Sequence, residues 1–370
     1  MEDRLRTIVD QFQIEGRFTT AEAFGAGHVH ETYRVVCQGP EVQTVYLLQK
    51  INPKVFRNVT GVMAHIQCVT EHLRQCLQRR GVEPLDRRVL SLVPTHDQRV
   101  VWCDPQGQAW RMVVFIEGSE TLETPRSTEQ VEQAAWAYGD FLACLQDLEP
   151  SSFQETLDHY HHGPEQFKAL LKAVRKDTCY RLTQARHEVE IIQGYEDYLQ
   201  RIQDRVDQGN LPRRIVHGDP KLNNVLFDRT NGQALCVIDL DTVMPGLTFY
   251  DFGDMVREII TDAAEDEANT SLVTLQMDRL EPLIRGYVAG AGVSLTADEI
   301  ETLCQGMTFM PLMMAMRYLT DFLQGDLTYK TQKIRHNLQR CRVQLKLVEL
   351  LHEQEDTCRS MVQALTRSAS

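Results

Sequence analysis

A chain of 370 residues, 42% of them hydrophobic and 25% charged, has the composition of a globular protein, and its length favours two domains or lobes. The formal net charge of −13 argues against nucleic acids and anionic membranes as partners, and no run of about 20 apolar residues predicts a transmembrane helix. The charged N-terminus lacks the apolar core of a signal peptide, and the ten cysteines show no CxxC pairing, so we expect reduced thiols and a cytoplasmic location.

The first part of the chain has the alternating pattern of short strands, interrupted by one long helix. Gly25 and Gly27 lie in the loop between the first two predicted strands. A glycine pair there can place backbone amides over phosphate groups, although most GxG turns bind nothing. The predicted elements are an amphipathic helix over 3–14, strands on either side of the glycine loop, a strand over 45–51, a helix over 58–80, and strands over 89–94, 99–103 and 110–116.

The strand over 45–51 contains Gln49 and Lys50 side by side. Because strand side chains alternate between two faces, only one of these residues can face a bound phosphate group. Lys50 is either that contact or an exposed residue at the strand end. Glu71, on the following predicted helix, is either the partner of the strand lysine or a solvated surface glutamate.

The strand pattern gives way to helices after Glu117, which predicts a boundary between two lobes. We expect an α+β fold with a small antiparallel sheet in residues 1–117, the nucleotide-binding lobe. A larger, mostly helical lobe in residues 118–370 would carry the catalytic and substrate-binding residues. The base of a nucleotide would pair with backbone groups of three residues beside the boundary, Phe115, Ile116 and Glu117.

The second part has the periodicity of helices almost throughout. Its predicted helices cover 128–148, with Ser127 as the cap, 188–206, 267–290, 297–324 and 330–352. The loop over 149–164 contains His159, His161 and His162. Because no carboxylate or cysteine accompanies them at a metal-binding spacing, a substrate contact or a helix cap is favoured over a metal site.

The segment from Ile215 to Asp241 carries the most specific pattern of the chain. Three short apolar runs are separated by a His-Gly-Asp loop and an Asn-Gly turn, and the third run ends on Asp239. Asp219 and Asn224 are five residues apart, as are the catalytic aspartate and the metal-binding asparagine of protein kinases.

Phosphoryl transfer from ATP explains these residue types. One carboxylate positions the attacking hydroxyl and takes its proton, while an amide oxygen and a second carboxylate hold magnesium against the phosphates. The sequence therefore predicts a protein-kinase-like phosphotransferase, with Asp219 as the base and Asn224 and Asp239 as magnesium ligands. Asp and Asn are also ordinary turn residues, so the prediction depends on their joint occurrence in a strand–loop–strand context.

A second acidic segment, Tyr250–Asp254, contains the letters DFG. It begins a predicted helix, whereas the metal-binding aspartate of a kinase follows a strand. We therefore expect Asp251 to brace the catalytic loop or to cap its own helix.

Arg317 and Asp321 are four residues apart on a predicted helix. Such a spacing is typical of a surface ion pair. The functional alternative is a pair that binds substrate hydroxyls.

These motifs, in this order, resemble the aminoglycoside phosphotransferase/choline kinase superfamily of small-molecule kinases, and within it the N-acetylhexosamine 1-kinases. The resembling segments are AGHVHETYRV near residue 30, YLLQKIN near 50, WRMVVFIEG near 115, the block 216–254 with HGDPKLNNVLF and VIDLDTVMPG, and MRYLTDFLQGDLTYK from 316. Two positions depart from the sugar-kinase pattern: Pro220 replaces a threonine, and Ala64-His65 replaces an acidic residue.

The resemblance implies a kinase that uses ATP and magnesium to phosphorylate the anomeric hydroxyl of N-acetylglucosamine or N-acetylgalactosamine. The implied residues are Asp219 as base, Lys221 near the transferred phosphate, Asn224 and Asp239 at magnesium and Arg317 at the sugar, with Asp321 added for its proximity to Arg317. The alternatives are a related kinase for an aminoglycoside, choline, ethanolamine or another sugar, and a non-catalytic nucleotide-binding relative. In each case the partner is a small molecule, and the oligomeric state is left open.

Overall fold

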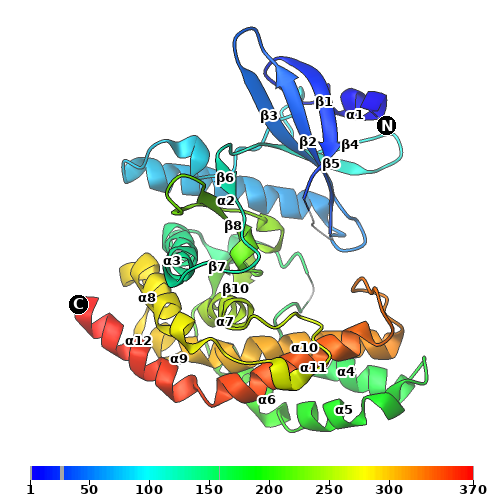
Figure 1. Cartoon of the computed structure of the whole chain (residues 1–370), viewed down its shortest axis with the longest axis vertical. Coiled ribbons are helices and arrows are strands. Elements are labelled where there is room, and N and C mark those ends of the chain that lie inside the picture. Colours follow the sequence, from blue (N-terminus) through cyan, green and yellow to red (C-terminus); the bar gives the residue numbers. More distant parts are fainter. Residues whose placement is uncertain (1, 26–28, 158, 370) are drawn as a thin grey trace. The chain divides into compact units, whose positions relative to one another are not determined.

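The chain folds into two units and passes from one to the other three times (Figure 1). The first unit comprises Met1–Glu120 and Leu226–Val243, and the second comprises Thr121–Val225 and Met244–Ser370. The computed structural model describes residues 2–25, 29–157 and 159–369, with side chains described up to residue 366. Gly27, predicted to contact phosphate, lies outside the described residues.

The first unit is built on a five-stranded antiparallel sheet with the strand order β1-β2-β3-β5-β4. Its strands are β1 (Arg17–Ala23), β2 (Glu31–Gln38), β3 (Gln43–Lys50), β4 (Trp102–Cys103) and β5 (Ala109–Val114). Helix α1 (Glu2–Val9) packs Leu5, Ile8 and Val9 into a core with Tyr46 and Trp110 of the sheet. Alternation along β3 and β5 brings Gln49 opposite Arg111, a pairing that positions part of the candidate site.

Two further elements complete the first unit. Helix α2 (Val59–Arg79) begins after Asn58, whose side chain accepts a hydrogen bond from the backbone N–H of Gly61. A small sheet has the order β6-β8-β9, from β6 (Ser119–Glu120), β8 (Val225–Asp228) and β9 (Ala234–Val237). The tight Asn-Gly turn predicted between β8 and β9 is part of a longer loop over 229–233, in which Gly232 has a positive φ of +70° and Asn231 does not have a positive φ.

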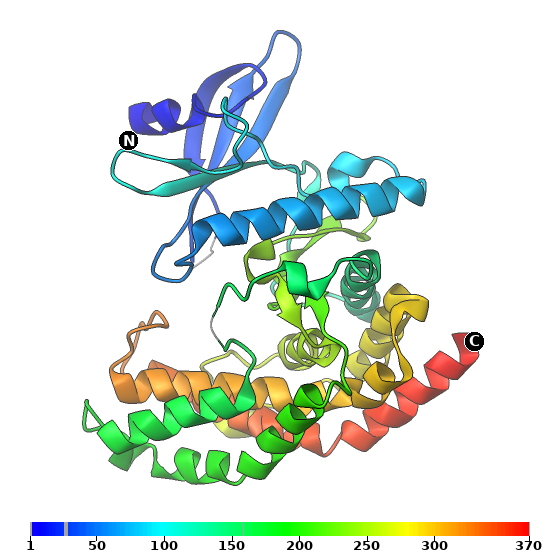
Figure 2. The same cartoon turned by 180° about the vertical axis from the view of Figure 1, so that it is seen from behind.

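The second unit is mostly helical. Its helices are α3 (Thr128–Cys144), α4 (Gly163–Lys176), α5 (Arg186–Gln193), α6 (Glu196–Asp207), α7 (Thr248–Ile259), α8 (Leu280–Ala291), α9 (Ala297–Thr302), α10 (Gly306–Gln324), α11 (His336–His352) and α12 (Glu355–Ala369). Figures 1 and 2 agree in placing α10 (orange) alongside α4 (green) and α11. The side chains between them form one buried core that includes Phe167, Leu319 and Leu345.

A short strand pair lies within this helical unit. Strand β7 (Arg214–Val216) pairs antiparallel with β10 (Met244–Gly246), and α7 follows directly after β10. Helix α7 approaches the start of α10 so closely that a Cβ on Gly253 would lie 2.1 Å from the carbonyl oxygen of Gly306. Glycine is therefore required at this crossing, which fixes α7 relative to α10.

The predicted α+β class, with an antiparallel sheet in the N-terminal part and helices in the C-terminal part, is confirmed. Several element boundaries were wrong. The single helix expected over 188–206 is two helices, because the backbone leaves helical geometry at Tyr195, which has a φ of −99° and a ψ of 6°. The helix expected over 297–324 is interrupted by a 3₁₀ turn at Leu303–Gln305, and that over 267–290 begins only at Leu280.

The remaining differences concern short elements. The strand expected over 89–94 forms one isolated bridge, Leu92 to Val113, and the helix expected over 3–14 ends at Val9. Helices α4 and α12 were not predicted. In the described part of the chain, no helix has the length and apolar character needed to cross a membrane.

Candidate active site

The loop that follows β7 is held by a carboxylate from α7. Asp251 accepts hydrogen bonds from the backbone N–H groups of His217 (2.7 Å) and Gly218 (2.8 Å), one on each oxygen. Gly218 has a φ of +83°, a conformation that glycine adopts without steric cost. The prediction that Asp251 braces this loop is confirmed, and the catalytic role of the loop stays a prediction.

Asp219 comes next in this loop and lies beside Lys221. The ammonium of Lys221 is 2.9 Å from the Asp219 carboxylate, a quarter of whose side-chain surface is exposed. The side-chain amide of Asn224 donates to the carbonyl oxygen of Asp219 at 2.9 Å, and the Tyr138 hydroxyl donates to the carbonyl oxygen of Lys221 at 2.7 Å. These bonds connect three of the sequence-predicted residues, Asp219, Lys221 and Asn224, in one turn of chain.

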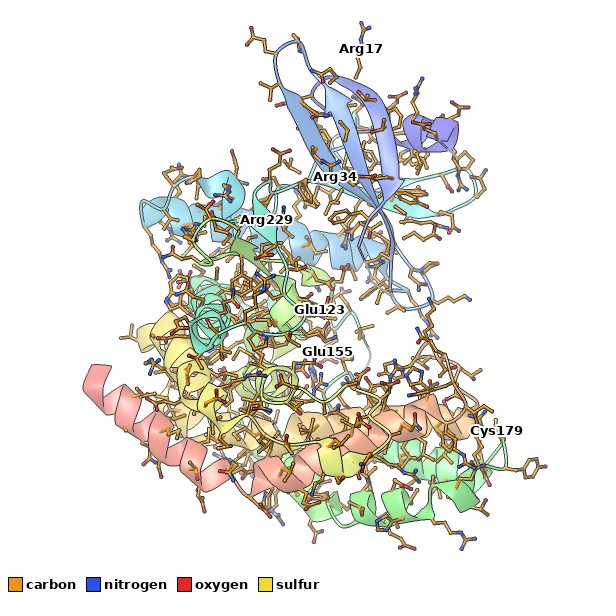
Figure 3. All side chains as sticks on the ribbon, viewed as in Figure 1. Arg17, Arg34, Glu123, Glu155, Cys179 and Arg229 are labelled. Carbon is orange, nitrogen blue, oxygen red and sulfur yellow. The ribbon has the colours of Figure 1, made fainter. Side chains whose placement is uncertain are left out.

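The same loop continues to Asn223, whose amide donates to Glu123 at 3.1 Å. Glu123 is labelled in Figure 3 and follows the start of the second unit by two residues. The loop is therefore held on both sides of Lys221.

Electrostatics keep Asp219 ionised. Burial raises the pKa of its carboxyl, but the adjacent Lys221 ammonium and His217 lower it, and the net pKa lies below the ordinary value. The same carboxylate raises the pKa of Lys221 well above its ordinary value. Near neutral pH the pair is a carboxylate that can accept a proton next to a permanent positive charge.

Within the first unit, the structure identifies an arginine that the sequence analysis missed. Arg111 forms a two-pronged ion pair with Asp241, with distances of 2.7 and 2.6 Å, and both side chains are buried. Its Nε donates to Gln49 at 2.8 Å, and Gln49 donates in turn to Thr32 at 3.2 Å. The sequence contained one sign of this residue, a single arginine in the apolar strand WRMVVF. A charged residue in a buried strand is expected to have a partner of opposite charge.

Asp239 lies next to this ion pair along the chain. It follows β9 with a φ of 60° and a ψ of 57°, a left-handed conformation that aspartate tolerates better than most residues. Burial lowers the pKa of Arg111, but the charge of Asp241 and, more weakly, that of Asp239 raise it, and the net pKa lies above the ordinary value. Burial raises the pKa of Asp241, but Arg111 and His30 outweigh it and keep that carboxyl ionised.

The alternation at the end of β3 separates Gln49 from Lys50. Gln49 contacts the buried Arg111, whereas the Lys50 ammonium pairs with Glu31 of β2 at 2.8 Å. Glu71 accepts a hydrogen bond from Gln67 on its own helix. The nucleotide contact of Lys50 stays a prediction.

The other predicted nucleotide contacts lie in loops and at the end of β5. Gly25 has a positive φ of +79°, and a Cβ there would meet no atom within 4 Å. The backbone carbonyl of Ile116 accepts a hydrogen bond from Ser119, and that of Glu117 accepts one from Arg87. The Phe115 ring makes an edge contact with Phe24, 5.7 Å between centroids. The binding of phosphates and base by these residues stays a prediction.

Arg317 and Asp321 on α10 are both buried, so the surface ion pair is wrong. The Arg317 guanidinium lies over the Tyr160 ring at 4.0 Å and donates to the Tyr160 carbonyl oxygen. The Asp321 oxygens accept hydrogen bonds, of 2.8 to 3.0 Å, from the backbone N–H groups of Leu327, Thr328 and Tyr329 and from the side chain of Asn337. This environment makes Asp321 a structural residue of the loop after α10, and its substrate contact stays a prediction.

The histidines of the 149–164 loop have separate roles. His162 caps α4 by accepting the backbone N–H of Glu165 at 3.2 Å, as one of the two favoured interpretations predicted. The ring of His161 contacts those of Tyr160 and Tyr250. Among the described residues, no group of three or more His, Cys, Asp or Glu side chains is arranged to hold a metal ion.

The predicted magnesium ligands have suitable chemistry. Asn224 directly precedes β8, and Asp239 follows β9. Because the amide nitrogen of Asn224 is bonded to Asp219, its oxygen is the atom left to act as a ligand. Amide and carboxylate oxygens are ligands that magnesium accepts.

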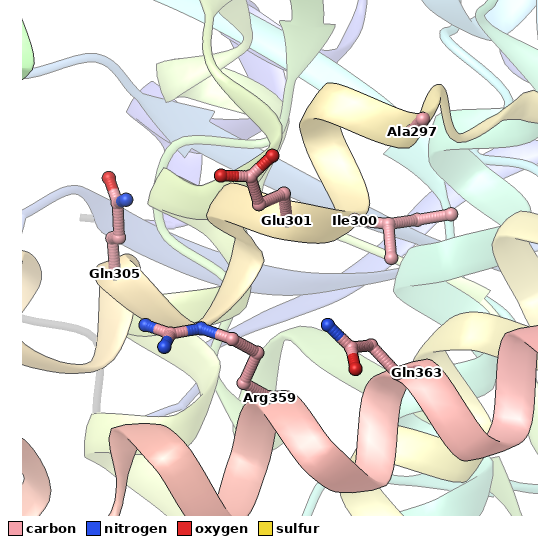
Figure 4. A pocket seen from close by; sticks show the side chains of 6 residues that line it. All are labelled: Ala297, Ile300, Glu301, Gln305, Arg359 and Gln363. Atoms are coloured by element: carbon pink, nitrogen blue, oxygen red, sulfur yellow. The ribbon is translucent and has the colours of Figure 1, made fainter.

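A pocket of about 560 Å³ lies elsewhere in the second unit, between α9 and α12 (Figure 4). Arg359 and Gln363 of α12 line one side of it, and Ile300, Glu301 and Gln305 line the other. None of the residues predicted to act in catalysis or binding lines this pocket, so it has no part in the candidate active site.

The fold is that of protein-kinase-like phosphotransferases. An aminoglycoside phosphotransferase from Alicyclobacillus acidocaldarius matches 96% of this chain and 95% of its own, with a TM-score of 0.61 at 13% sequence identity. Spectinomycin phosphotransferase in complex with ADP and spectinomycin matches 96% of this chain and 98% of its own, with a TM-score of 0.58 at 13% identity. At these identities the likeness concerns the fold.

The family is shown by the sequence itself. Residues 77–283, more than half of the chain, match the model of the phosphotransferase enzyme family, APH. The chain therefore belongs to this family of small-molecule phosphotransferases. The matched segment includes Asp219, Lys221, Asn224 and Asp239.

Arg111→Met should destabilise the first unit, because it leaves the Asp241 carboxylate buried without its counter-charge. We expect a loss of about 3–5 kcal/mol in the free energy of unfolding, measured by urea titration. The double variant Arg111→Met/Asp241→Asn should recover most of this loss. Arg99→Met, which removes an exposed ion pair with Asp97, is the control and should change little. Equal effects of the two single variants would contradict the role given to the Arg111–Asp241 pair.

Asp251→Asn should change the pH dependence of stability. Burial raises the pKa of Asp251 from 3.8 to about 6, so the folded state binds its proton more tightly than the unfolded chain does. The stability from this group is fully present below about pH 4 and is lost as the pH rises through about 6, a change of about 3 kcal/mol.

Turnover should decrease as the pH falls, although stability increases. The protonated Asp251 carboxyl accepts weaker hydrogen bonds from the two backbone N–H groups than the carboxylate does. We therefore expect activity of the unsubstituted protein to fall below about pH 6 while its stability relative to Asp251→Asn rises. Urea titrations between pH 4 and 8 measure the second effect. Stability curves that run parallel for the two proteins would contradict the assignment.

Proposed function

We propose that this phosphotransferase is an ATP- and magnesium-dependent kinase that phosphorylates the anomeric hydroxyl of N-acetylglucosamine or N-acetylgalactosamine, giving the sugar 1-phosphate. The observation that carries the phosphotransferase chemistry is the Asp219–Lys221 pair on a loop braced by Asp251. The N-acetylhexosamine is supported by the sequence resemblance and by the buried Arg317.

Asp219 would position the acceptor hydroxyl and take its proton. Its lowered pKa keeps it in the carboxylate form that can accept a hydrogen bond from the hydroxyl. Lys221, 2.9 Å away, would place positive charge near the transferred phosphoryl group. Because phosphoryl transfer depends mainly on positioning and electrostatics, the rigid loop matters as much as the basicity of the carboxylate.

ATP is the proposed phosphoryl donor, in line with the ADP complex of spectinomycin phosphotransferase, which has the same fold. Magnesium, when bound, would offset negative charge on the phosphate oxygens. Asn224 and Asp239 are the proposed protein ligands, through the amide oxygen and the carboxylate. Gly25, Lys50 and the backbone around Ile116 are the proposed nucleotide contacts.

The acceptor is tested by ADP release from ATP and magnesium with N-acetylglucosamine, N-acetylgalactosamine, glucose, galactose, choline, ethanolamine and kanamycin. Turnover confined to the N-acetylhexosamines would support the full proposal. Turnover with an amine or an aminoglycoside would keep the phosphotransferase chemistry and contradict the sugar assignment. Silence across the panel would contradict the proposed function.

Asp219→Asn should nearly abolish turnover, because the amide cannot take the proton of the hydroxyl. We expect a loss of at least about 100-fold in kcat, with nucleotide binding retained. Asp147→Asn, on the surface loop after α3, is the matched control and should keep normal activity. Near-normal turnover of Asp219→Asn would remove the carboxylate from the mechanism.

Asp239→Ala should raise the magnesium concentration needed for nucleotide binding, because one anionic ligand is lost. Titrating ATP at several fixed magnesium concentrations measures this, with the exposed Asp86→Ala as control. Nucleotide affinity that stays unchanged at limiting magnesium would make Asp239 a structural residue.

A further inference from the structure

A cluster of rings and one guanidinium lies in the second unit, on the segment before α4 and on α7 and α10. The His161 ring lies 4.5 Å from that of Tyr160 and 4.6 Å from that of Tyr250, measured between centroids. The Arg317 guanidinium lies 4.0 Å from the centroid of the Tyr160 ring. We call these four residues, Tyr160, His161, Tyr250 and Arg317, the aromatic–arginine cluster.

Two polar atoms of the cluster are buried without a hydrogen-bond partner among the described residues. They are Nε2 of His161 and Nε of Arg317, in side chains of residues that are 8% and 7% exposed. Buried polar groups in folded proteins are usually hydrogen-bonded, and these two atoms differ from other unpartnered ones in belonging to side chains that both contact Tyr160. A ligand that supplies the missing partners is the simplest explanation.

The charge of Arg317 is also uncompensated within the described part of the chain. Its other contacts are the Tyr160 carbonyl oxygen and the Met314 sulfur at 3.4 Å, neither of which carries a charge. Two nearby carboxylates have cations of their own: Asp219 pairs with Lys221 at 2.9 Å, and Asp254 pairs with Arg257 at 2.7 Å. The oxygens of Asp321, on the same helix as Arg317, are occupied by three backbone N–H groups and the Asn337 amide. The cluster therefore presents a net positive charge.

The cluster lies within electrostatic range of the proposed base. Burial raises the pKa of the Tyr160 phenol, and the charges of Asp219 and Asp254 raise it further, while Arg317 and Lys221 oppose them. Burial, with the charge of Arg317, lowers the pKa of His161 well below its ordinary value, so its imidazole is neutral near pH 7. Tyr250 of the cluster also directly precedes Asp251, whose carboxylate holds the two residues before Asp219, so the cluster packs against the support of the proposed catalytic loop.

The chemistry of the two free atoms selects the ligand. Nε of Arg317 is an N–H that can only donate, so its partner must be an acceptor atom. A neutral imidazole nitrogen can donate or accept according to its tautomer, and a hydroxyl or carbonyl oxygen can meet the donating form. An ammonium group offers no acceptor atom, and its charge is repelled by the guanidinium.

Resting on the proposed function, in which Arg317 contacts the sugar, we infer that His161 Nε2 joins Arg317 Nε in binding oxygen atoms of the phosphoryl acceptor. The acceptor is an uncharged, oxygen-rich molecule, and the aromatic–arginine cluster excludes cationic amines. His161 is thereby a specificity-determining residue of the same site. The oxygens concerned are hydroxyl oxygens or the carbonyl oxygen of an acetamido group.

His161→Phe tests this inference, because phenylalanine keeps an aromatic ring in contact with Tyr160 and Tyr250 and removes Nε2. We expect the KM for N-acetylglucosamine to rise about tenfold, the loss of one well-formed hydrogen bond, with the KM for ATP unchanged. His161→Gln, which restores a polar group, should recover part of the affinity. His187→Phe, on the exposed face of α5, is the matched control and should leave both constants unchanged.

The melting temperature of the variant distinguishes a ligand-binding role of His161 from a purely structural one. Without acceptor, His161→Phe should melt at the same temperature as the unsubstituted protein or higher, because it removes an unpartnered buried polar atom. A lower melting temperature together with an unchanged acceptor KM would overturn the inference in favour of an internal or water-mediated partner. If His161→Phe does not fold, Arg317→Lys removes Nε with the charge retained, and an unchanged acceptor KM in that variant would overturn the inference.

The acceptor panel separates this inference from the proposed function. Absence of turnover with every acceptor would contradict the proposed function itself. Turnover with N-acetylhexosamines and an unchanged KM in His161→Phe would contradict only the inference. Preference of the unsubstituted protein for choline or ethanolamine over the sugars would overturn the exclusion of cations.

Discussion

The hydrogen bonds from two consecutive backbone N–H groups to the Asp251 carboxylate are the constraint on which the candidate site depends. Two neighbouring N–H groups can point at one carboxylate only if the backbone turns sharply, and Gly218 makes this turn with its positive φ. The backbone turn thereby fixes the direction in which the Asp219 side chain points from the loop. Asp251 is fixed in turn, because α7 crosses the start of α10 at the closest distance that Gly253 and Gly306 allow.

Two buried arginines, Arg111 and Arg317, differ in whether a carboxylate neutralises their charge. Within its own unit, the charge of Arg111 is neutralised by Asp241, which contacts both terminal nitrogens of the guanidinium, while Gln49 accepts the hydrogen bond from Nε. Arg317 has a ring, a carbonyl oxygen and a sulfur around it, and its Nε has no partner among the described residues. A buried guanidinium that is paired with a carboxylate stabilises the fold, whereas one without a counter-charge can be stabilised by a bound ligand.

Much of the candidate site could be predicted because its residues are close in sequence. Asp219, Lys221 and Asn224 lie within six residues, so the loop that contains them also brings them together. The spacing of Arg317 and Asp321 gave a wrong prediction. Two residues four positions apart on a helix are expected to contact each other, but their spacing does not show which face of the helix is buried. Both side chains proved to be buried and engaged elsewhere.

The sequence by itself determined the family, the alternation of strands and helices, and the local motif from His217 to Asp239, since these depend on residue type and spacing. Only the tertiary structure decided which of Gln49 and Lys50 turns inward, because that depends on the register between β3 and β5. It also brought Tyr160 and His161 to Arg317 across more than 150 residues of chain. Contacts at such separations arise from helix packing, which no local pattern encodes.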